Sequence, residues 1–155
     1  MIIKISSLNE GTNRWEEKIS AAKEGLNEIM FPNELNIELD VTKGKNRLEI
    51  FVSVFTLVHF ECDRCGIEFD EVMGGNISVS FIQRNEPFPD EMPGDDLRSY
   101  LLGQDEIDIS SEIRDAVLLS IPMKVICDED CQGICFKCKA NLNIEQCRCE
   151  TYDDI

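Results

Sequence analysis

The chain has 155 residues and combines strong acidity with eight cysteines. Its 15 Lys and Arg residues against 31 Asp and Glu residues give a formal net charge of −16. Such a charge repels phosphate backbones and anionic lipid surfaces, so it argues against RNA or membrane binding through a broad basic face and favours a basic partner. The length predicts one domain with room for a small appendage.

Hydrophobic patterns in the first 62 residues predict a helix and a hairpin. Apolar residues recur at helical spacing between residues 15 and 29. Residues 36–42 alternate in polarity, residues 43–46 have turn composition, and residues 48–60 are rich in β-branched and aromatic side chains, which predicts a β-hairpin. Apolar residues occupy both faces of its second arm, so we expect a central strand. One face holds Leu48, Ile50, Val52 and Val54, and the other holds Phe51 and Phe55.

A third strand and an acidic connection follow. We expect a turn at Gly74-Gly75-Asn76 and then a strand over residues 77–82, which completes an antiparallel meander. Residues 84–106 are rich in proline and acids. Such a linker is more typical of a solvated mobile connection than of an acidic docking loop.

The next segment predicts a short strand over residues 107–109 and a helix after it. Ser110 or Ser111 can cap the helix, and Pro122 ends it. Leu118 and Leu119 widen its apolar side, so we expect the helix to pack on the sheet. The central apolar side consists of Ile113, Ala116, Val117, Ser120 and Ile121.

The cysteines fall into one pair and one cluster. Cys62 and Cys65 form a C-x2-C pair, and six more cysteines lie between residues 127 and 149. The first residues show no export signal, so we expect a cytoplasmic protein. Thiols stay reduced in the cytoplasm, where clustered cysteines indicate metal ligands or redox groups.

Eight thiolates suffice for two closed tetrahedral zinc sites. Chain continuity favours a local site in the tail, made of Cys135, Cys138, Cys147 and Cys149. The remaining four cysteines would form the second site: Cys62, Cys65, Cys127 and Cys131. A second partition groups Cys127 and Cys131 with Cys135 and Cys138, and leaves Cys62 and Cys65 for Cys147 and Cys149. We prefer the first partition and expect two structural Zn²⁺ ions.

Other uses of these cysteines remain open. They are one zinc ion with spare thiols, a disulfide cluster beside a redox pair, and an iron–sulfur cluster. A catalytic zinc would use histidine or carboxylate ligands and an open position. The single histidine, His59, lies among apolar residues of a predicted strand, where a partly buried structural role is expected. The chain contains none of the G-x-S-x-G, Walker, G-x-G-x-x-G or H-E-x-x-H motifs, so we expect no enzyme.

Together these elements predict an α+β fold. An antiparallel β meander is packed by a C-terminal helix and followed by a cysteine-rich zinc-knuckle tail. We expect residues 1–125 to form the main domain, with the acidic linker at 84–106, and residues 126–155 to form a metal-binding tail packed on the same domain.

Several segments resemble a known family. They are Cys62-Asp63-Arg64-Cys65, the segment Ile107 to Pro122, and Cys127 to Cys149 with its CQGIC and NLN strings. Together with Leu8-Asn9-Glu10-Gly11, they are similar to the YceD-like family, the large ribosomal RNA subunit accumulation proteins. That family commonly has Pro after the cysteine that matches Cys135 and Gly after the cysteine that matches Cys138. This chain has Phe136 and Lys139 at these two positions. The resemblance also implies a strand over residues 13–19, which leaves a helix at about 20–27.

The resemblance implies a non-enzymatic factor that supports 23S rRNA accumulation and large ribosomal subunit assembly. The family's gene often lies beside that of a small zinc-binding large-subunit protein. We therefore expect a basic large-subunit ribosomal protein or a pre-ribosomal particle as partner, and no membrane. One alternative is a zinc-stabilised acidic interaction adaptor unrelated to ribosomes. Direct RNA binding is disfavoured, because the tail, counted from Lys124, contains four basic residues and seven acidic residues and is therefore net negative.

Overall fold

The computed structural model describes residues 1–85 and 97–149. These residues form two compact units. The sheet unit comprises residues 1–58 and 72–121, and the cysteine unit comprises residues 59–71 and the described residues from 122 onward. Within the described ranges, no helix is long and apolar enough to cross a membrane.

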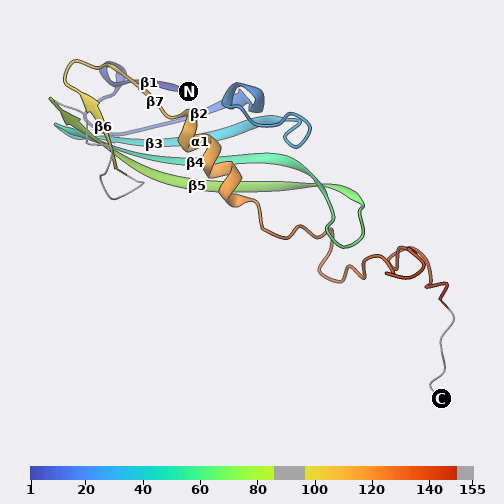
Figure 1. The fold of residues 1–155 in the computed structure, drawn as a ribbon. Coiled ribbons are helices and arrows are strands. Elements are labelled where there is room, and N and C mark those ends of the chain that lie inside the picture. The colour runs from blue at the N-terminus through green and yellow to red at the C-terminus, as the bar shows by residue number, and fades with distance from the viewer. Residues whose placement is uncertain (86–96, 150–155) are drawn as a thin grey trace. The chain divides into compact units, whose positions relative to one another are not determined.

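Five strands form the main sheet in the order β2-β3-β4-β5-β6 (Figure 1). β2 pairs antiparallel with β3, β3 pairs antiparallel with β4, and β5 pairs parallel with β6. The ends of β4 and β5 that the short connection 62–67 joins lie in the cysteine unit. The strands are β2 Gly11–Ser20, β3 Glu34–Lys43, β4 Arg47–Glu61, β5 Glu68–Arg84 and β6 Leu97–Leu101.

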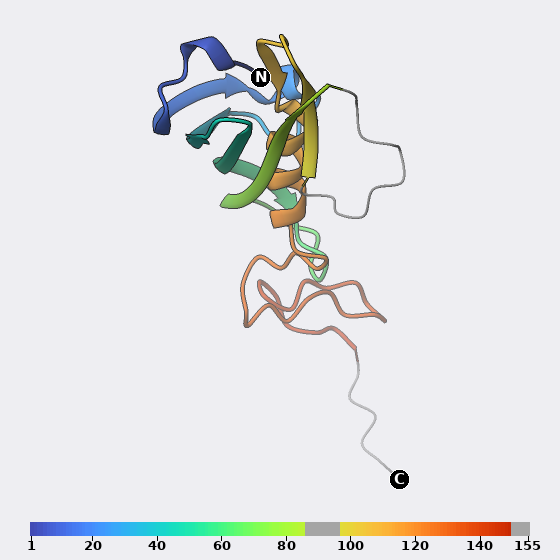
Figure 2. The same cartoon turned by 90° about the vertical axis from the view of Figure 1, so that its left-hand side faces the viewer.

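Two short strands and three helices complete the sheet unit. β1 (Ile2–Lys4) pairs antiparallel with β7 (Glu106–Asp108). The 3-10 helices η1 (Ile5–Ser7) and η2 (Ala21–Glu24) flank β2, and α1 spans Ser110–Ser120. Figure 2 shows α1 against one face of the sheet, with β6 beside β5.

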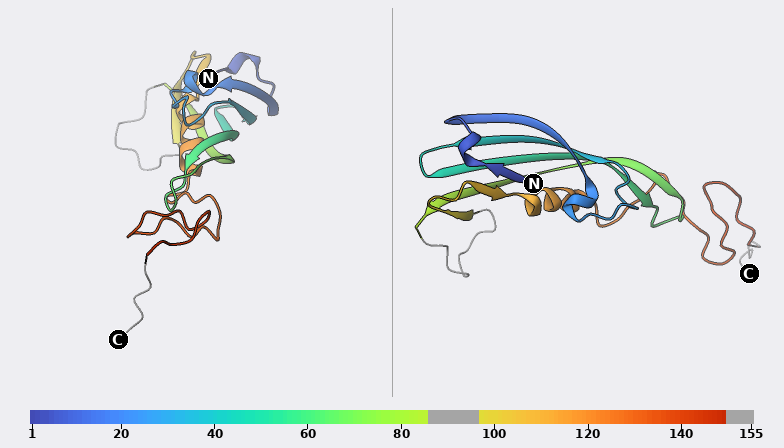
Figure 3. Two further views of the ribbon diagram at one scale, coloured as in Figure 1. Left: turned by 90° about the vertical axis from the view of Figure 1, so that its right-hand side faces the viewer. Right: turned by 90° about the horizontal axis from the view of Figure 1, so that it is seen from above.

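The core lies between this face of the sheet and α1. Register pairs such as Leu39↔Val52 and Ile37↔Val54 put the apolar sides of β3 and β4 on the same face. From α1, Ile113, Ala116 and Val117 are buried. Burying these side chains contributes about 1.5–3 kcal/mol for each Leu, Ile or Val. The predicted α+β class, with a β meander packed by a C-terminal helix, is confirmed, and Figure 3 shows the same layers in two further views.

The predicted turn at residues 74–76 is wrong, because these residues lie inside β5. A Cβ atom at Gly75 would lie 1.8 Å from the carbonyl oxygen of Ala116, so the helix backbone packs directly on the strand there. At Gly74 a Cβ would lie 2.6 Å from the ring of Phe55. Glycine in a strand can mark such a close approach as well as a turn.

The ends of the predicted helices also differ. The helix expected at about 20–27 is the single 3-10 turn η2, which ends where Gly25 has a φ of +74°. At the start of α1 the capping group is not a serine. Asp108 Oδ1 accepts hydrogen bonds from the Ser110 N–H (2.9 Å) and hydroxyl (2.6 Å), and these bonds lower the pKa of Asp108.

Two expectations about exposure and connection need correction. Leu118 and Leu119 are exposed, so the buried side of α1 is narrower than the sequence predicts. Residues 97–101 form β6, so the connection expected over 84–106 contains a strand. Parallel pairing with β5 depends on a partner that local sequence patterns do not identify. The rest of the acidic linker, residues 86–96, lies outside the described residues.

Candidate metal centres

The structure brings the eight cysteines together in two groups of four. We call Cys62, Cys65, Cys127 and Cys131 the first tetrad, and Cys135, Cys138, Cys147 and Cys149 the second tetrad. Within each tetrad, the four sulfur atoms lie within 4.8 Å of one another. These are the two sets of the preferred partition. None of the eight cysteines forms a disulfide in the described structure.

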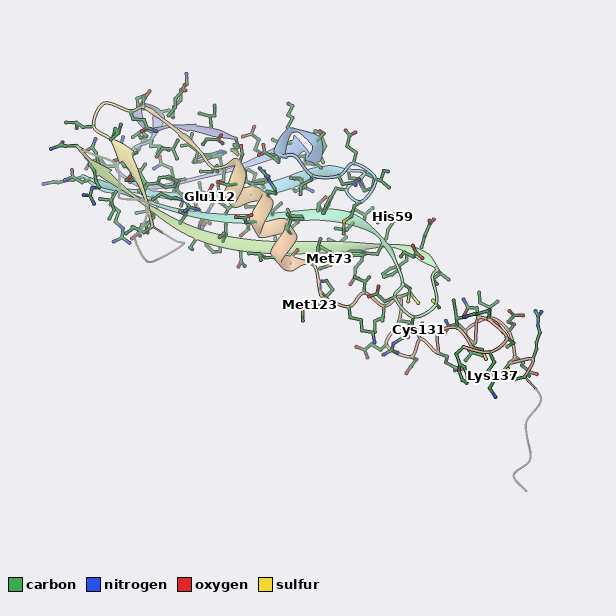
Figure 4. The ribbon with its side chains drawn as sticks, viewed as in Figure 1. His59, Met73, Glu112, Met123, Cys131 and Lys137 are labelled. Atoms are coloured by element: carbon green, nitrogen blue, oxygen red, sulfur yellow. The ribbon has the colours of Figure 1, made fainter. Side chains whose placement is uncertain are left out.

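The sulfur spacing fits a tetrahedral ion. Four Zn–S bonds of about 2.3 Å place the sulfur atoms about 3.8 Å apart. In the first tetrad, Sγ–Sγ distances are 3.8 Å for Cys62–Cys131 and 3.6 Å for Cys65–Cys127. In the second tetrad, Cys135 Sγ lies 3.5 Å from Cys147 Sγ and 3.7 Å from Cys149 Sγ. Figure 4 shows sulfur atoms gathered near the labelled Cys131.

A hydrogen-bonded knuckle shapes the first C-x2-C pair. The Cys62 N–H donates to the Ile67 carbonyl oxygen at 2.9 Å, and the Gly66 N–H donates to the Cys62 carbonyl oxygen at 2.9 Å. Gly66 has a φ of +69°, a conformation that glycine adopts at little cost. This tight return directs the sulfurs of Cys62 and Cys65 towards the same point.

The second C-x2-C pair repeats this knuckle at the same relative positions. The Cys135 N–H donates to the Ala140 carbonyl oxygen at 2.8 Å, and the Lys139 N–H donates to the Cys135 carbonyl oxygen at 2.9 Å. Lys139, in the place of Gly66, has a φ of +61° and is the only non-glycine residue with positive φ in the described ranges. The knuckle therefore forms without the glycine common in the resembled family, at the cost of a left-handed lysine.

We predict that Lys139→Gly stabilises the second tetrad. A left-handed conformation costs a residue with a Cβ about 1–2 kcal/mol, and the greater chain entropy of glycine offsets part of that gain. We expect a net gain of about 0.5–1 kcal/mol, measured as a several-fold slower release of metal to a chelator. The matched change Gly66→Ala should speed release from the first tetrad. Equal release rates for wild type and Lys139→Gly would contradict the strain argument.

Side chains of the first knuckle hold the later chain in place. The Asp63 N–H donates to the Val125 carbonyl oxygen (2.9 Å), and Asp63 Oδ2 accepts from the Val125 N–H (2.7 Å). Arg64 Nη1 donates to the Cys131 carbonyl oxygen at 3.0 Å. The residues between the first pair of cysteines thus position Cys127 and Cys131, which lie more than sixty positions later in the sequence.

Asn143, which lies between Cys138 and Cys147 in the sequence, bonds to a ligand of the first tetrad, and sequence reasoning did not assign it this role. Its Nδ2 donates to the sulfur of Cys131 at 3.4 Å, and its Oδ1 accepts from the Gln132 N–H at 2.7 Å. A polar group bonded to a ligand in this way orients the ligand and tunes its basicity. The only available signal was its place in the Asn141-Leu142-Asn143 string.

The thiols of each tetrad titrate unequally. Burial raises the pKa of Cys62, but backbone N–H donors outweigh it and lower the pKa to about 6, whereas burial and neighbouring thiols raise the pKa of Cys127 to about 12. In the second tetrad, backbone N–H donors, led by that of Ala140, lower the pKa of Cys138 to about 6. Neighbouring thiols and burial raise the pKa of Cys149 to about 12. Crowded sulfurs cannot all ionise unless a cation balances them, as a divalent metal does.

His59 lies outside both tetrads, on β4. Its Nδ1 lies 2.7 Å from Asp70 Oδ1, and its Nε2 lies 3.8 Å from Glu68 Oε2. The Asp70 hydrogen bond raises the pKa of His59. A raised pKa in the folded state stabilises the fold fully below the unfolded pKa of about 6.5, and this contribution is lost as the pH rises through the folded value. The partly exposed strand position agrees with the structural role expected for this residue.

Comparison with known proteins identifies the family. The model of the family described as "Large ribosomal RNA subunit accumulation protein YceD" matches residues 52–154, about two thirds of the chain. The chain belongs to the YceD family. The match covers most of the second hairpin arm, α1 and both tetrads. It includes every segment that carried the resemblance except the N-terminal one, Leu8-Asn9-Glu10-Gly11.

Two curated relatives that match the chain come from plants. The chain is 32% identical to the chloroplastic YCED homolog 1 of Arabidopsis thaliana, over 74% of this chain and 43% of the relative. It is 27% identical to the protein of the same name from Zea mays, over 74% of this chain and 48% of that relative. The matched region thus spans less than half of each relative. No solved structure matches the chain.

Proposed function

We propose that this YceD-family chain is a non-enzymatic factor that supports 23S rRNA accumulation and large ribosomal subunit assembly by binding a basic ribosomal protein. The family's description links it to the large ribosomal RNA. The proposal places the chain in the cytoplasm, where eight thiols stay reduced. Each tetrad binds one structural Zn²⁺, because four thiolates complete a closed shell and leave no position for a substrate.

The observation that carries the partner assignment is an acidic face on the sheet, opposite to the face that α1 covers. Glu16 of β2 lies directly opposite Glu38 of β3 in the register. Like charges at directly opposed positions destabilise a sheet. Among the described residues, neither glutamate has an ion-pair partner within 4.0 Å. Their repulsion would be relieved by a partner that brings lysine or arginine side chains between them.

Two half-exposed aromatic rings adjoin these acids. Phe51 is 41% exposed and Phe55 is 44% exposed, both on the outward side of β4. Two shallow hollows, of about 220 and 360 Å³, share Asp40 and Phe51 as lining residues. Carboxylates beside an aromatic ring provide ion pairing and cation–π contact for the same basic side chain. We call Glu16, Glu38, Asp40, Glu49, Phe51 and Phe55 the acidic face.

Part of the acidic face is already neutralised within the chain. Arg14 makes a two-pronged ion pair with Asp40, with Nη2 2.7 Å from Oδ2, and this hydrogen bond lowers the pKa of Asp40. Arg47 Nη2 lies 3.1 Å from Glu49 Oε1. The charge of Arg14 also acts on Glu38, but neither Glu16 nor Glu38 has an ion-pair partner within 4.0 Å among the described residues, so these two glutamates are the first positions to test.

The test is sedimentation of ribosomal particles from cells that carry tagged chain. Wild type should co-sediment with precursors of the large subunit, and deletion should reduce 23S rRNA relative to 16S rRNA. The Glu16→Lys/Glu38→Lys variant should lose at least tenfold of its co-sedimentation. Glu10→Lys/Glu28→Lys makes the same change of charge at exposed sites off the acidic face, and should retain most of it. Normal 23S levels on deletion, with the chain absent from precursor fractions, would refute the function.

A further inference from the structure

Charge within the cysteine unit is segregated along the chain. Residues 122–133 contain one basic residue, Lys124, and three acids. Residues 134–149, which hold the second tetrad, contain three basic residues, Lys137, Lys139 and Arg148, and one acid, Glu145. Four thiolates around Zn²⁺ carry a net charge of about −2, so the loop is close to neutral in a chain of net charge −16.

The same loop exposes large apolar side chains. Phe136 is 79% exposed and Ile144 is 78% exposed. Phe136 lies at the tip of the second knuckle, and Lys137 Nζ lies 5.7 Å from the centroid of its ring. Figure 4 labels Lys137 in this loop. An exposed aromatic ring with an ammonium group over it combines a flat stacking surface with a nearby cation.

Comparison of the two knuckles shows that this exposure is not a requirement of the knuckle itself. At the positions of Phe136 and Lys137, the first knuckle has Asp63 and Arg64, and both bond within the unit. The backbone hydrogen bonds of the two knuckles match. The side chains differ, because Lys137 and Lys139 have no ion-pair partner among the described residues. The tip side chains of the second knuckle are therefore free for a partner.

The chemistry of this tip fits an unpaired stretch of RNA. Bases outside a duplex stack on aromatic side chains, and lysines bind the adjacent phosphates. A duplex offers no free base face to Phe136. RNA is also the molecule that the family's description names. An acidic protein could pair with the lysines, but it would not use the planar face of the ring.

We propose that the second cysteine loop binds single-stranded RNA, with a base stacked on Phe136 and phosphates held by Lys137 and Lys139. This contact is separate from the acidic face, which would bind a basic protein. The sum over the whole tail disfavours RNA binding, but that sum combines the acids of residues 128–130 and of the C-terminal residues with the basic loop. The acids at 128–130 belong to the segment that completes the first tetrad, whereas Lys137 and Lys139 lie in the segment of the second tetrad.

The experiment is fluorescence anisotropy of the zinc-loaded full chain with a labelled single-stranded RNA of mixed sequence, and with the same strand in a duplex. At 50 mM salt, the single strand should bind at least tenfold more tightly than the duplex. Phe136→Ala should weaken this binding at least tenfold, whereas Phe51→Ala on the acidic face should change it less than twofold. Lys137→Gln/Lys139→Gln should reduce the salt dependence by about one counterion or more, and Lys18→Gln/Lys23→Gln serves as its control.

Lys139→Gly separates a binding role from a structural one. It should strengthen metal retention through relief of backbone strain and weaken RNA binding through loss of a charge. The proposal is overturned if metal-loaded chain binds no single-stranded RNA, if the duplex binds equally well, or if Phe136→Ala binds like wild type. It is also overturned if RNA fails to bind and Phe136→Ala instead abolishes capture of an acidic protein. None of these outcomes depends on the sedimentation test of the acidic face.

Discussion

Cys131→Ser should remove one of two bound metal ions and unfold the part of the cysteine unit around the first tetrad, while the second tetrad and the sheet unit remain folded. In the first tetrad, Cys62, Cys65 and Cys131 are buried, and the partly buried hydrophobic residues that pack against them in the described ranges are Phe69, Ile126 and Cys127. So small an apolar cluster does not stabilise a unit by itself. Binding of structural zinc supplies about 10–16 kcal/mol in small zinc-binding folds, and this free energy is folding free energy.

Metal analysis and NMR measure this expectation directly. Wild type should contain close to two zinc ions per chain, and Cys131→Ser close to one. Amide signals of residues 122–133 should collapse to random-coil positions, while those of β3, β4 and α1 remain dispersed. Met123→Ser changes a fully exposed side chain of the same unit and should retain both ions. A metal-free wild type with dispersed signals over residues 122–149 would refute the metal centres.

Gly75→Ala should cost about 3 kcal/mol in the free energy of unfolding of the sheet unit. The added Cβ would lie 1.8 Å from the Ala116 carbonyl oxygen and 2.8 Å from its carbonyl carbon, so α1 must move off β5. Overpacking of this kind costs about 1–3 kcal/mol, and the upper value applies because the obstructing atoms are backbone. Loss of chain entropy in the unfolded state recovers less than about 1 kcal/mol of this cost.

Gly74→Ala is the matched control on the neighbouring position of the same strand. Its Cβ would lie 2.6 Å from Cδ1 of Phe55, a half-exposed side chain that can rotate towards solvent. We expect a loss of about 1 kcal/mol or less. Urea denaturation followed by circular dichroism measures both variants. A Gly75→Ala protein as stable as wild type would show that α1 does not pack on β5 as described.

Only part of the candidate site could be predicted from sequence. Cysteine spacing indicated both tetrads, because chain continuity restricts which sulfurs can meet. It did not reveal Asn143 as a donor to the sulfur of Cys131, or Arg64 as a donor to the Cys131 carbonyl oxygen. Such contacts depend on the path of the chain between the cysteines. The left-handed conformation of Lys139 is recognised only from the structure, in which Lys139 occupies the position that Gly66 has in the first knuckle.

The net charge of −16 and the eight cysteines are the features of the sequence that most restrict what the protein can bind. The α+β class follows from the alternation of apolar and polar residues in β3 and β4 and from the apolar side of α1. A strand or helix that buries one face needs apolar residues at a fixed spacing along the sequence. Tertiary structure alone decided that Gly74 and Gly75 lie within a strand, since glycine permits both a turn and a close helix contact. It alone separated an acidic sheet face from a near-neutral cysteine loop, because net charge sums residues that folding places on different surfaces.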